Sequence, residues 1–268
     1  MVLTKRKILV ITIVVLSLIL ATLLCILMIP EKEPEYIPPT TEVTFPTLEA
    51  NPLSPEDFVY ENGFLTCLTA ETVLGIDVSS HQREIDWNAV KAAGVEFVMI
   101  RVGYRGTDQG GIYEDEYAKS NYEGAKHAGL LVGAYFFSQA TTTEEALEEA
   151  NFTLSVMDDW ELDMPLVFDW EYSGEGSRVA TMVAAVVTEC AKTFCQTVNN
   201  AGFTPMVYFN TDIARYFMYL DELSDYPFWL AMYDQDFIFD YKVDMWQYTS
   251  SGSIPGIEGN VDINLYFP

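Results

Sequence analysis

Two acidic residues, Asp169 and Glu171, end an apolar run in the middle of this 268-residue chain. The run covers residues 165–170 and turn-forming residues follow it, a pattern typical of a buried strand. Side chains alternate along a strand, so both carboxyl groups should point to one side, with their backbones about 6–7 Å apart. Such a pair is costly to bury unless a site uses it. On this stretch alone, a catalytic pair and a helix-capping aspartate beside a solvated glutamate both stay open.

Acidic, aromatic and polar residues also end the other apolar runs. Asp77 and Asp262 are the further acids. The candidates for substrate binding are Arg101, Tyr135, Phe137, Tyr208, Trp229, Tyr233, Trp246 and Gln247. Aromatic rings stack on sugar rings and paired carboxylates hydrolyse glycosidic bonds, so this set indicates a glycan-cleaving site. Each residue alone could be core, cap or turn, but a purely structural fold needs no ring of acids.

The elements that must position these residues alternate between strand and helix from residue 74 onward. The predicted strands are residues 74–78, 97–104, 130–137, 165–170, 204–209, 228–232, 244–248 and 261–265. The predicted helices are residues 87–93, 116–128, 143–157, 177–200 and 213–223. This alternation favours an α/β fold, a small β/α barrel over residues 74–268 with its site at the C-terminal strand ends. The late strands have little helix between them, so we expect an irregular barrel on that side.

Four segments precede the predicted barrel. Residues 1–7 form a basic tail, and the uncharged residues 8–29 would make a helix of about 33 Å, enough to span a bilayer. The basic flank places the N-terminus in the cytoplasm and the bulk outside. A cleaved signal peptide is the alternative, although no small-x-small site follows the run. Residues 30–57, rich in Pro, Thr and Glu, read as an extended stalk, and residues 58–73 as a β-hairpin turning at Asn62-Gly63.

Composition restricts the partners of the chain. A net charge of −26 argues against nucleic acid as a partner. No HExxH, CxxC or P-loop pattern occurs, so we expect no metal and no cofactor. Cys190 and Cys195 sit five residues apart on a predicted helix and face different sides, so we expect no disulfide between them. We expect a monomer.

Several motifs in matching order resemble one known family. They are Gly-Ile-Asp-Val-Ser-Ser-His-Gln at 75–82, Ile-Asp-Trp at 85–87, Asp-Trp-Glu at 169–171, Trp-Leu-Ala at 229–231, Trp-Gln-Tyr at 246–248 and Val-Asp-Ile-Asn at 261–264. Together they resemble the glycoside hydrolase family 25 lysozymes, or N-acetylmuramidases. The chain departs from many members after the second strand, where residues 101–105 read Arg-Val-Gly-Tyr-Arg and not a Lys-Ala-Thr-Glu-like segment. We expect this departure to alter contacts with the substrate.

The resemblance implies a flattened, irregular TIM-like barrel that hydrolyses the β-1,4 bond between N-acetylmuramic acid and N-acetylglucosamine. It assigns the general acid to Glu171 and the second acid to Asp169, with Asp77 and Asp262 lining the same site. The implied partner is the peptidoglycan glycan strand. With the predicted anchor, the location would be the outer side of a bacterial cell membrane, crossed once.

The mechanism can also be argued from the residues. One carboxyl must stay protonated near neutral pH, and burial beside another anion raises a carboxyl pKa in that direction. Glu171 has the longer side chain and should reach the glycosidic oxygen. Asp169 could attack the sugar, stabilise positive charge or orient the 2-acetamido group, so the stereochemical course stays open. A non-catalytic wall-binding module and a hydrolase of a different glycan are the alternative functions.

Overall fold

The computed structural model describes residues 47–233 and 235–268. The predicted tail, the predicted membrane span and the first part of the predicted stalk lie outside these residues. No helix in the described part of the chain combines the length and the apolar character needed to cross a membrane.

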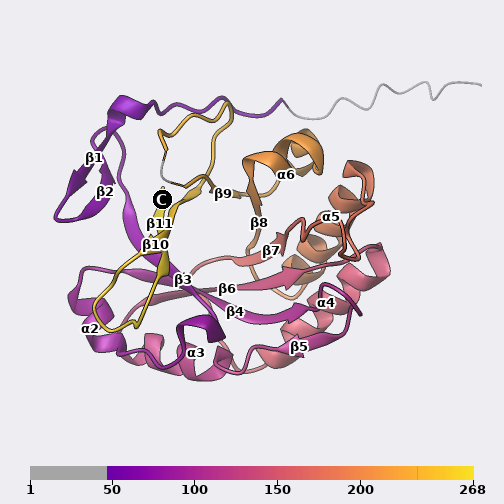
Figure 1. Ribbon diagram of the computed structural model, residues 1–268, viewed down its shortest axis with the longest axis horizontal. Coiled ribbons are helices and arrows are strands. Elements are labelled where there is room, and N and C mark those ends of the chain that lie inside the picture. The colour runs from indigo at the N-terminus through magenta and orange to yellow at the C-terminus, as the bar shows by residue number, and fades with distance from the viewer. Residues whose placement is uncertain (1–46, 234) are drawn as a thin grey trace, which may run out of the picture. The chain divides into compact units, whose positions relative to one another are not determined.

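Eight strands of the described chain close into a barrel (Figure 1). They are β3 (Val73–Val78), β4 (Phe97–Arg105), β6 (Leu131–Ser138), β7 (Leu166–Trp170), β8 (Pro205–Asn210), β9 (Phe228–Ala231), β10 (Met245–Gly252) and β11 (Val261–Tyr266). Neighbours from β3 through β10 pair in parallel, whereas β11 runs antiparallel to both β10 and β3 and closes the ring. The predicted α/β barrel is confirmed, and the reversed direction of β11 is an addition to it.

Helices follow the early strands and are missing between the late ones. They are α2 (Trp87–Ala92), α3 (Ala118–His127), α4 (Thr143–Val156), α5 (Ala184–Asn200) and α6 (Thr211–Tyr216), with 3-10 turns η2 (Ser80–Gln82) and η3 (Leu220–Leu223). The described residues between β9 and β10, and those between β10 and β11, contain no helix. The expected irregular side of the barrel is therefore confirmed.

Two predicted helices differ from the observed ones. The helix expected over 177–200 begins only at Ala184, because Val183 at its N-terminus is extended (φ −119°, ψ 151°) and Arg178 donates its backbone N–H to Thr107. The helix expected over 213–223 is divided into α6 and η3. A short strand, β5 (Ile112–Glu114), was not expected and pairs antiparallel with the end of β4.

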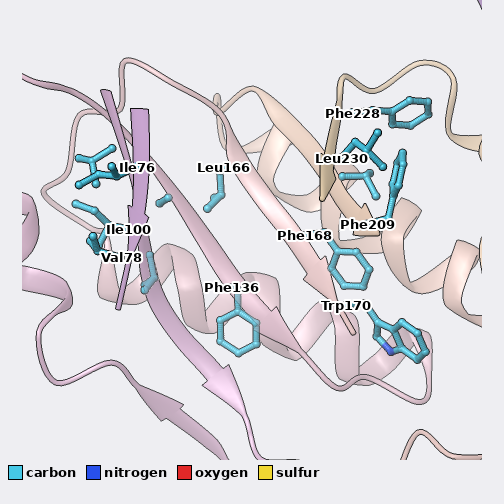
Figure 2. Close-up of a cluster of buried hydrophobic side chains, with 14 of the residues drawn as sticks. Ile76, Val78, Ile100, Phe136, Leu166, Phe168, Trp170, Phe209, Phe228 and Leu230 are labelled. Carbon is cyan, nitrogen blue, oxygen red and sulfur yellow. The ribbon is translucent and has the colours of Figure 1, made fainter. Parts of the chain in front are cut away.

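Alternation along the strands divides the core into two layers. One set of side chains, which includes Met99, Val167 and Met206, fills the inside of the barrel. The set on the opposite face packs between the barrel and its helices. Figure 2 shows members of this outer layer, among them Phe168 and Trp170 on β7. The side chains of this inner layer that lie toward the C-terminal ends of the parallel strands line the cavity at that end of the barrel.

The predicted hairpin is present as β1 (Phe58–Glu61) and β2 (Phe64–Cys67), paired antiparallel. Asn62 and Gly63 both have positive φ (54° and 92°), which a two-residue type I′ turn requires. The ring of Phe58 packs edge-on against Phe237 and Trp246, with centroids 5.1 Å apart in each case. The hairpin therefore leans on the barrel, as expected.

The last part of the predicted stalk is not a free spacer. Asn51 donates its backbone N–H to Asp240 at 3.0 Å, and Glu49 accepts one from Lys242 at 2.9 Å. Leu48 and Leu53 pack against the core, and the 3-10 turn η1 (Pro55–Asp57) leads into the hairpin. The apolar side chains and backbone pairing thus place residues 47–57 on the barrel, which corrects the predicted boundary at residue 58.

Candidate active site

Four acidic side chains line a single cavity of about 210 Å³ at the C-terminal ends of the parallel strands. Asp77 lies in β3, Asp169 in β7, and Glu171 one residue beyond β7. Asp262 lies near the start of β11, opposite Asp77 in the antiparallel register. Because β11 is reversed, the start of this strand reaches the same rim as the ends of its neighbours. The structure thus brings the four predicted acids together.

Most of the predicted substrate-binding residues line the same cavity. They are Arg101, Tyr135, Phe137, Tyr208, Trp229, Tyr233 and Gln247. Ser79, His81 and Gln82, from the loop after β3, complete the lining and were not among the predicted contacts. Gln82 shapes this loop, because its Oε1 accepts the backbone N–H of Ser79 at 2.9 Å and its Nε2 donates to the carbonyl of Asn260 at 3.2 Å.

Trp246 is the exception, and its prediction as a sugar-binding residue is wrong. The side chain is 2% exposed and packs on the outside of the barrel, 4.6 Å from the ring of Phe237. Its indole N–H donates to the carbonyl of Met232 at 2.9 Å. Neighbouring side chains on a strand point to opposite faces, so Trp246 and Gln247 cannot both enter the cavity. Gln247 takes the inner face.

Asp77 is held by two amide groups. Its Oδ2 accepts hydrogen bonds from Gln247 Nε2 at 2.7 Å and from Asn264 Nδ2 at 2.9 Å. Burial raises the pKa of Asp77 well above its usual range, and Asp262 adds to the rise, while the two amides oppose it. The protein therefore fixes the position of this carboxyl group.

The amides that hold Asp77 are themselves oriented by aromatic side chains. Tyr208 and Tyr233 both donate their hydroxyls to Gln247 Oε1, at 2.9 Å and 2.7 Å. Trp229 donates its indole N–H to Asn264 Oδ1 at 2.9 Å. Because each amide oxygen is occupied, each NH₂ group must face the carboxylate. Asn264 was quoted in a motif but given no role, although its spacing of two from Asp262 puts both on one strand face.

Asp169 is as deeply buried as Asp77 but has fewer partners. It is 5% exposed, and its Oδ1 has no hydrogen-bond partner among the described residues. Burial raises the pKa of Asp169 well above its usual range, Glu171 and Asp77 raise it further, and the cation of Arg101 opposes them. A buried carboxyl oxygen without a partner is costly in a folded protein and is a feature of sites that await a ligand.

Glu171 and Asp262 line the same cavity and are less buried than Asp77 and Asp169. Burial raises the pKa of Glu171, and the charge of Asp262 raises it further. Burial raises the pKa of Asp262 to about 6. A carboxyl group that keeps its proton near neutral pH, beside a second carboxyl group, can act as a general acid.

Arg101 supplies the cation of the cavity wall. Its guanidinium donates to the buried Asp115 at 2.8 Å and to Ser80 Oγ at 3.1 Å. Asp115 also accepts the backbone N–H of Ser80 at 2.9 Å. Arg101 therefore both lines the cavity and fastens the loop after β3. In the described part of the chain, no group of three or more His, Cys, Asp or Glu side chains could hold a metal ion.

Known proteins resemble this chain in sequence and in fold. The autolytic lysozyme of Clostridium acetobutylicum is 31% identical over 200 residues, which cover 72% of this chain and 55% of that protein. The chain thus spans about half the length of this relative. The bacterial lysozyme of Streptomyces coelicolor has a similar structure, with a TM-score of 0.61 and 25% identity over 72% of this chain and 91% of that one. The modular autolysin LytC of Streptococcus pneumoniae shares the fold, with a TM-score of 0.66 and 24% identity over 78% of this chain and 52% of that one.

A family model settles the predicted resemblance. The model of the glycosyl hydrolases family 25 matches residues 76–257, more than half of the chain and nearly all of the barrel. The predicted enzyme class, a glycoside hydrolase, is confirmed with it. The chain belongs to the glycosyl hydrolases family 25.

Proposed function

We propose that this protein is a muramidase that cleaves the β-1,4 bond between N-acetylmuramic acid and N-acetylglucosamine in peptidoglycan. The observation that carries the proposal is the carboxyl pair Asp169 and Glu171, buried at the rim of a family 25 barrel. A relative with the barrel in common is named an autolytic lysozyme. Aromatic side chains such as Tyr135 and Phe137 line the same cavity and suit a sugar ring.

Glu171 is the general acid in this proposal. Its pKa is raised by burial and by Asp262, so the carboxyl group keeps a proton that it can deliver to the glycosidic oxygen. As that oxygen takes the proton, the bond to the anomeric carbon breaks and the leaving sugar departs as an alcohol. Positive charge develops on the anomeric carbon and its ring oxygen as the bond breaks, and addition of water to that carbon completes the hydrolysis.

Asp169 acts on that developing charge. Its buried Oδ1 lacks a partner among the described residues, so a substrate group is free to take that place. In its ionised form, Asp169 either stabilises the cationic centre or orients the 2-acetamido group, so that the substrate supplies its own nucleophile. Asp77 and Asp262 are assigned to the same catalytic set. Direct attack by Asp169 would give a covalent sugar–enzyme ester.

The proposed location is the outer face of a bacterial membrane, with residues 8–29 as a single-pass anchor. The support is the uncharged run itself, preceded by Lys5, Arg6 and Lys7 and followed by acidic residues. Fractionation of cells that produce the full chain, before and after alkaline extraction, tests the anchor. A full-length chain found in the culture medium would contradict it.

The test of the activity is Glu171→Gln on purified peptidoglycan. We expect the variant to lose turnover, measured as reducing ends released and as masses of the muropeptide fragments. Glu123→Gln is the matched control, because Glu123 lies on the exposed face of α3 and, among the described residues, its ion pair is with Lys119. Retained activity in Glu171→Gln would contradict the assignment of Glu171 as the general acid.

The same assay, repeated on defined glycans with and without N-acetylmuramic acid, separates the alternative functions. A protein that binds peptidoglycan but releases no reducing ends would be a wall-binding module. A protein that cleaves only glycans without N-acetylmuramic acid would be a hydrolase of another polymer.

A further inference from the structure

The backbone at Glu171 lies just beyond the end of a sheet ladder. The last paired residues of β6 and β7 are Ser138 and Trp170. The next pair along both strands would be Gln139 and Glu171, but the strand has ended and no ladder pair forms there. The backbone carbonyl of a residue at this position would be unpaired unless another group donated a hydrogen bond to it.

The side chain of Gln139 provides the missing bond. Its Nε2 donates to the backbone carbonyl of Glu171 at 2.7 Å and to the carbonyl of Ser138 at 3.0 Å. The residue is fully buried, with 0% exposure. The amide therefore extends the connection between β6 and β7 by one residue, to the position of the proposed acid.

Hydrogen bonds from distant side chains also fix the backbone at Gln139 and next to it. Its backbone carbonyl accepts a hydrogen bond from Arg178 Nη1 at 2.9 Å, and Arg178 Nη2 pairs with Glu145 at 2.5 Å. On the same segment, the carbonyl of Ala140 accepts the indole N–H of Trp170 at 3.2 Å. These bonds fix the backbone at Gln139 and Ala140, which carries the amide that binds Glu171.

Packing alone does not explain a glutamine here. The Oε1 atom of Gln139 is buried and has no partner among the described residues. An apolar side chain of similar size would avoid the cost of that unpaired acceptor. The gain that offsets the cost is the pair of bonds donated by Nε2.

We propose that Gln139 is a positioning residue for the reaction, fixing the backbone of Glu171 so that its carboxyl group is held over the scissile bond. The inference rests on the proposed muramidase function and adds a group that does not touch the substrate. Small displacements of a catalytic group lower the rate of the chemical step more than they weaken binding.

The test compares two variants with a control. Gln139→Met keeps the size of the side chain and removes both donated hydrogen bonds. We expect kcat on peptidoglycan to fall about 10- to 100-fold, with KM changed less than about twofold. Thr188→Val is the control, because it removes one buried hydrogen bond, from the N–H of Tyr219 at 2.9 Å, on α5 outside the cavity. The melting temperature should fall in both Gln139→Met and Thr188→Val, whereas kcat should fall only in Gln139→Met.

Gln139→Glu adds a readout that a structural role would not give. A protonated carboxyl group can donate to the carbonyl of Glu171, whereas a carboxylate repels it. We expect kcat to approach the wild-type value at low pH and to fall toward that of Gln139→Met as the pH rises.

Three results would overturn the inference. They are wild-type kcat in Gln139→Met, an equal loss of kcat in Thr188→Val, and a pH-independent loss in Gln139→Glu. If wild-type protein releases no fragments at all, the proposed function fails instead, which is a different result from any of these.

Discussion

Asp77 and Asp169 are two aspartates at nearly the same depth, 6% and 5% exposed, in opposite hydrogen-bonding situations. Asp77 Oδ2 accepts two side-chain amide bonds, whereas Asp169 has a buried oxygen with no partner among the described residues. Burial raises the pKa of both. The comparison separates a carboxyl group that the protein has already satisfied from one left for a substrate.

The difference follows from where each aspartate lies in the barrel. Asp77 neighbours the helix-free side, where Gln247 on β10 and Asn264 on β11 both direct their amides at its carboxyl group. Asp169 lies on the side of the barrel that is covered by helices. There the side chain of Gln139 donates to the backbone carbonyl of Glu171, and Asp169 Oδ1 has no partner among the described residues. The helix-free side therefore supplies hydrogen-bond donors to the carboxyl group of Asp77, whereas the helix-covered side supplies a donor to the backbone beside Asp169.

The largest expected effect that separates the two aspartates is on turnover. Asp169→Asn removes a carboxyl group that can ionise as the cationic centre forms, so we expect kcat to fall by about 10³-fold. The melting temperature should change little, because the variant exchanges one buried polar group without a partner for another of nearly the same shape. Enzyme assays on purified peptidoglycan and thermal unfolding measure the two effects. A marked loss of stability would show that Asp169 is not the unsatisfied group.

The second expected effect is on stability. Asp77→Ala leaves the amides of Gln247 and Asn264 without their acceptor, at a cost of about 1–3 kcal/mol for each group left unpaired. Asp169→Ala should cost less, because it strands no donor. Denaturant titrations of both variants give the free energies of unfolding. Equal losses in the two variants would remove the distinction.

Adding Asn264→Leu to Asp77→Ala sharpens the result. The double variant should lose less stability than the sum of the two single variants, because one substitution removes the group that the other leaves unpaired.

The smallest expected effect is a shift along the pH axis. The charge of Asp262 raises the pKa of Glu171, so a neutral asparagine at 262 should lower it. Because turnover needs protonated Glu171, kcat of Asp262→Asn should fall at a lower pH than in the wild type. The pKa of Asp262 is itself raised to about 6, so its influence develops above that pH. Profiles of kcat against pH for both proteins, scaled to their maxima, measure the shift, and coincident alkaline limbs would contradict it.

Much of this arrangement could be predicted from the sequence, because periodicity and strand ends carry it. The eight barrel strands and the hairpin at Asn62-Gly63 follow from local patterns, and Asp77, Asp169 and Glu171 follow from their places at strand ends. Asp262 lies at the start of β11 and reaches the same rim only because that strand is reversed. Trp246 could have been excluded by the same rule, since Gln247 beside it must face the other way. The error came from counting aromatic residues without applying alternation.

The remaining features depend on contacts between distant parts of the chain. Nothing local in residues 261–266 distinguishes a parallel strand from an antiparallel one. The bond from Gln139 to Glu171 joins residues 32 positions apart, and the segment at Asn51 pairs with Asp240 far along the chain. The composition of residues 30–57 predicted a stalk. Leu48 and Leu53, which pack this segment against the core, were too few to change that prediction.

The closure of the barrel by β11 also has a consequence for biosynthesis. Asn264, which holds Asp77 in place, lies 187 positions after it in the chain, and Asp262 arrives on the same strand. A growing polypeptide therefore has no assembled cavity until its final barrel strand has left the ribosome. Until then the chain lacks two groups of the site, the carboxyl group of Asp262 and the amide of Asn264 that holds Asp77.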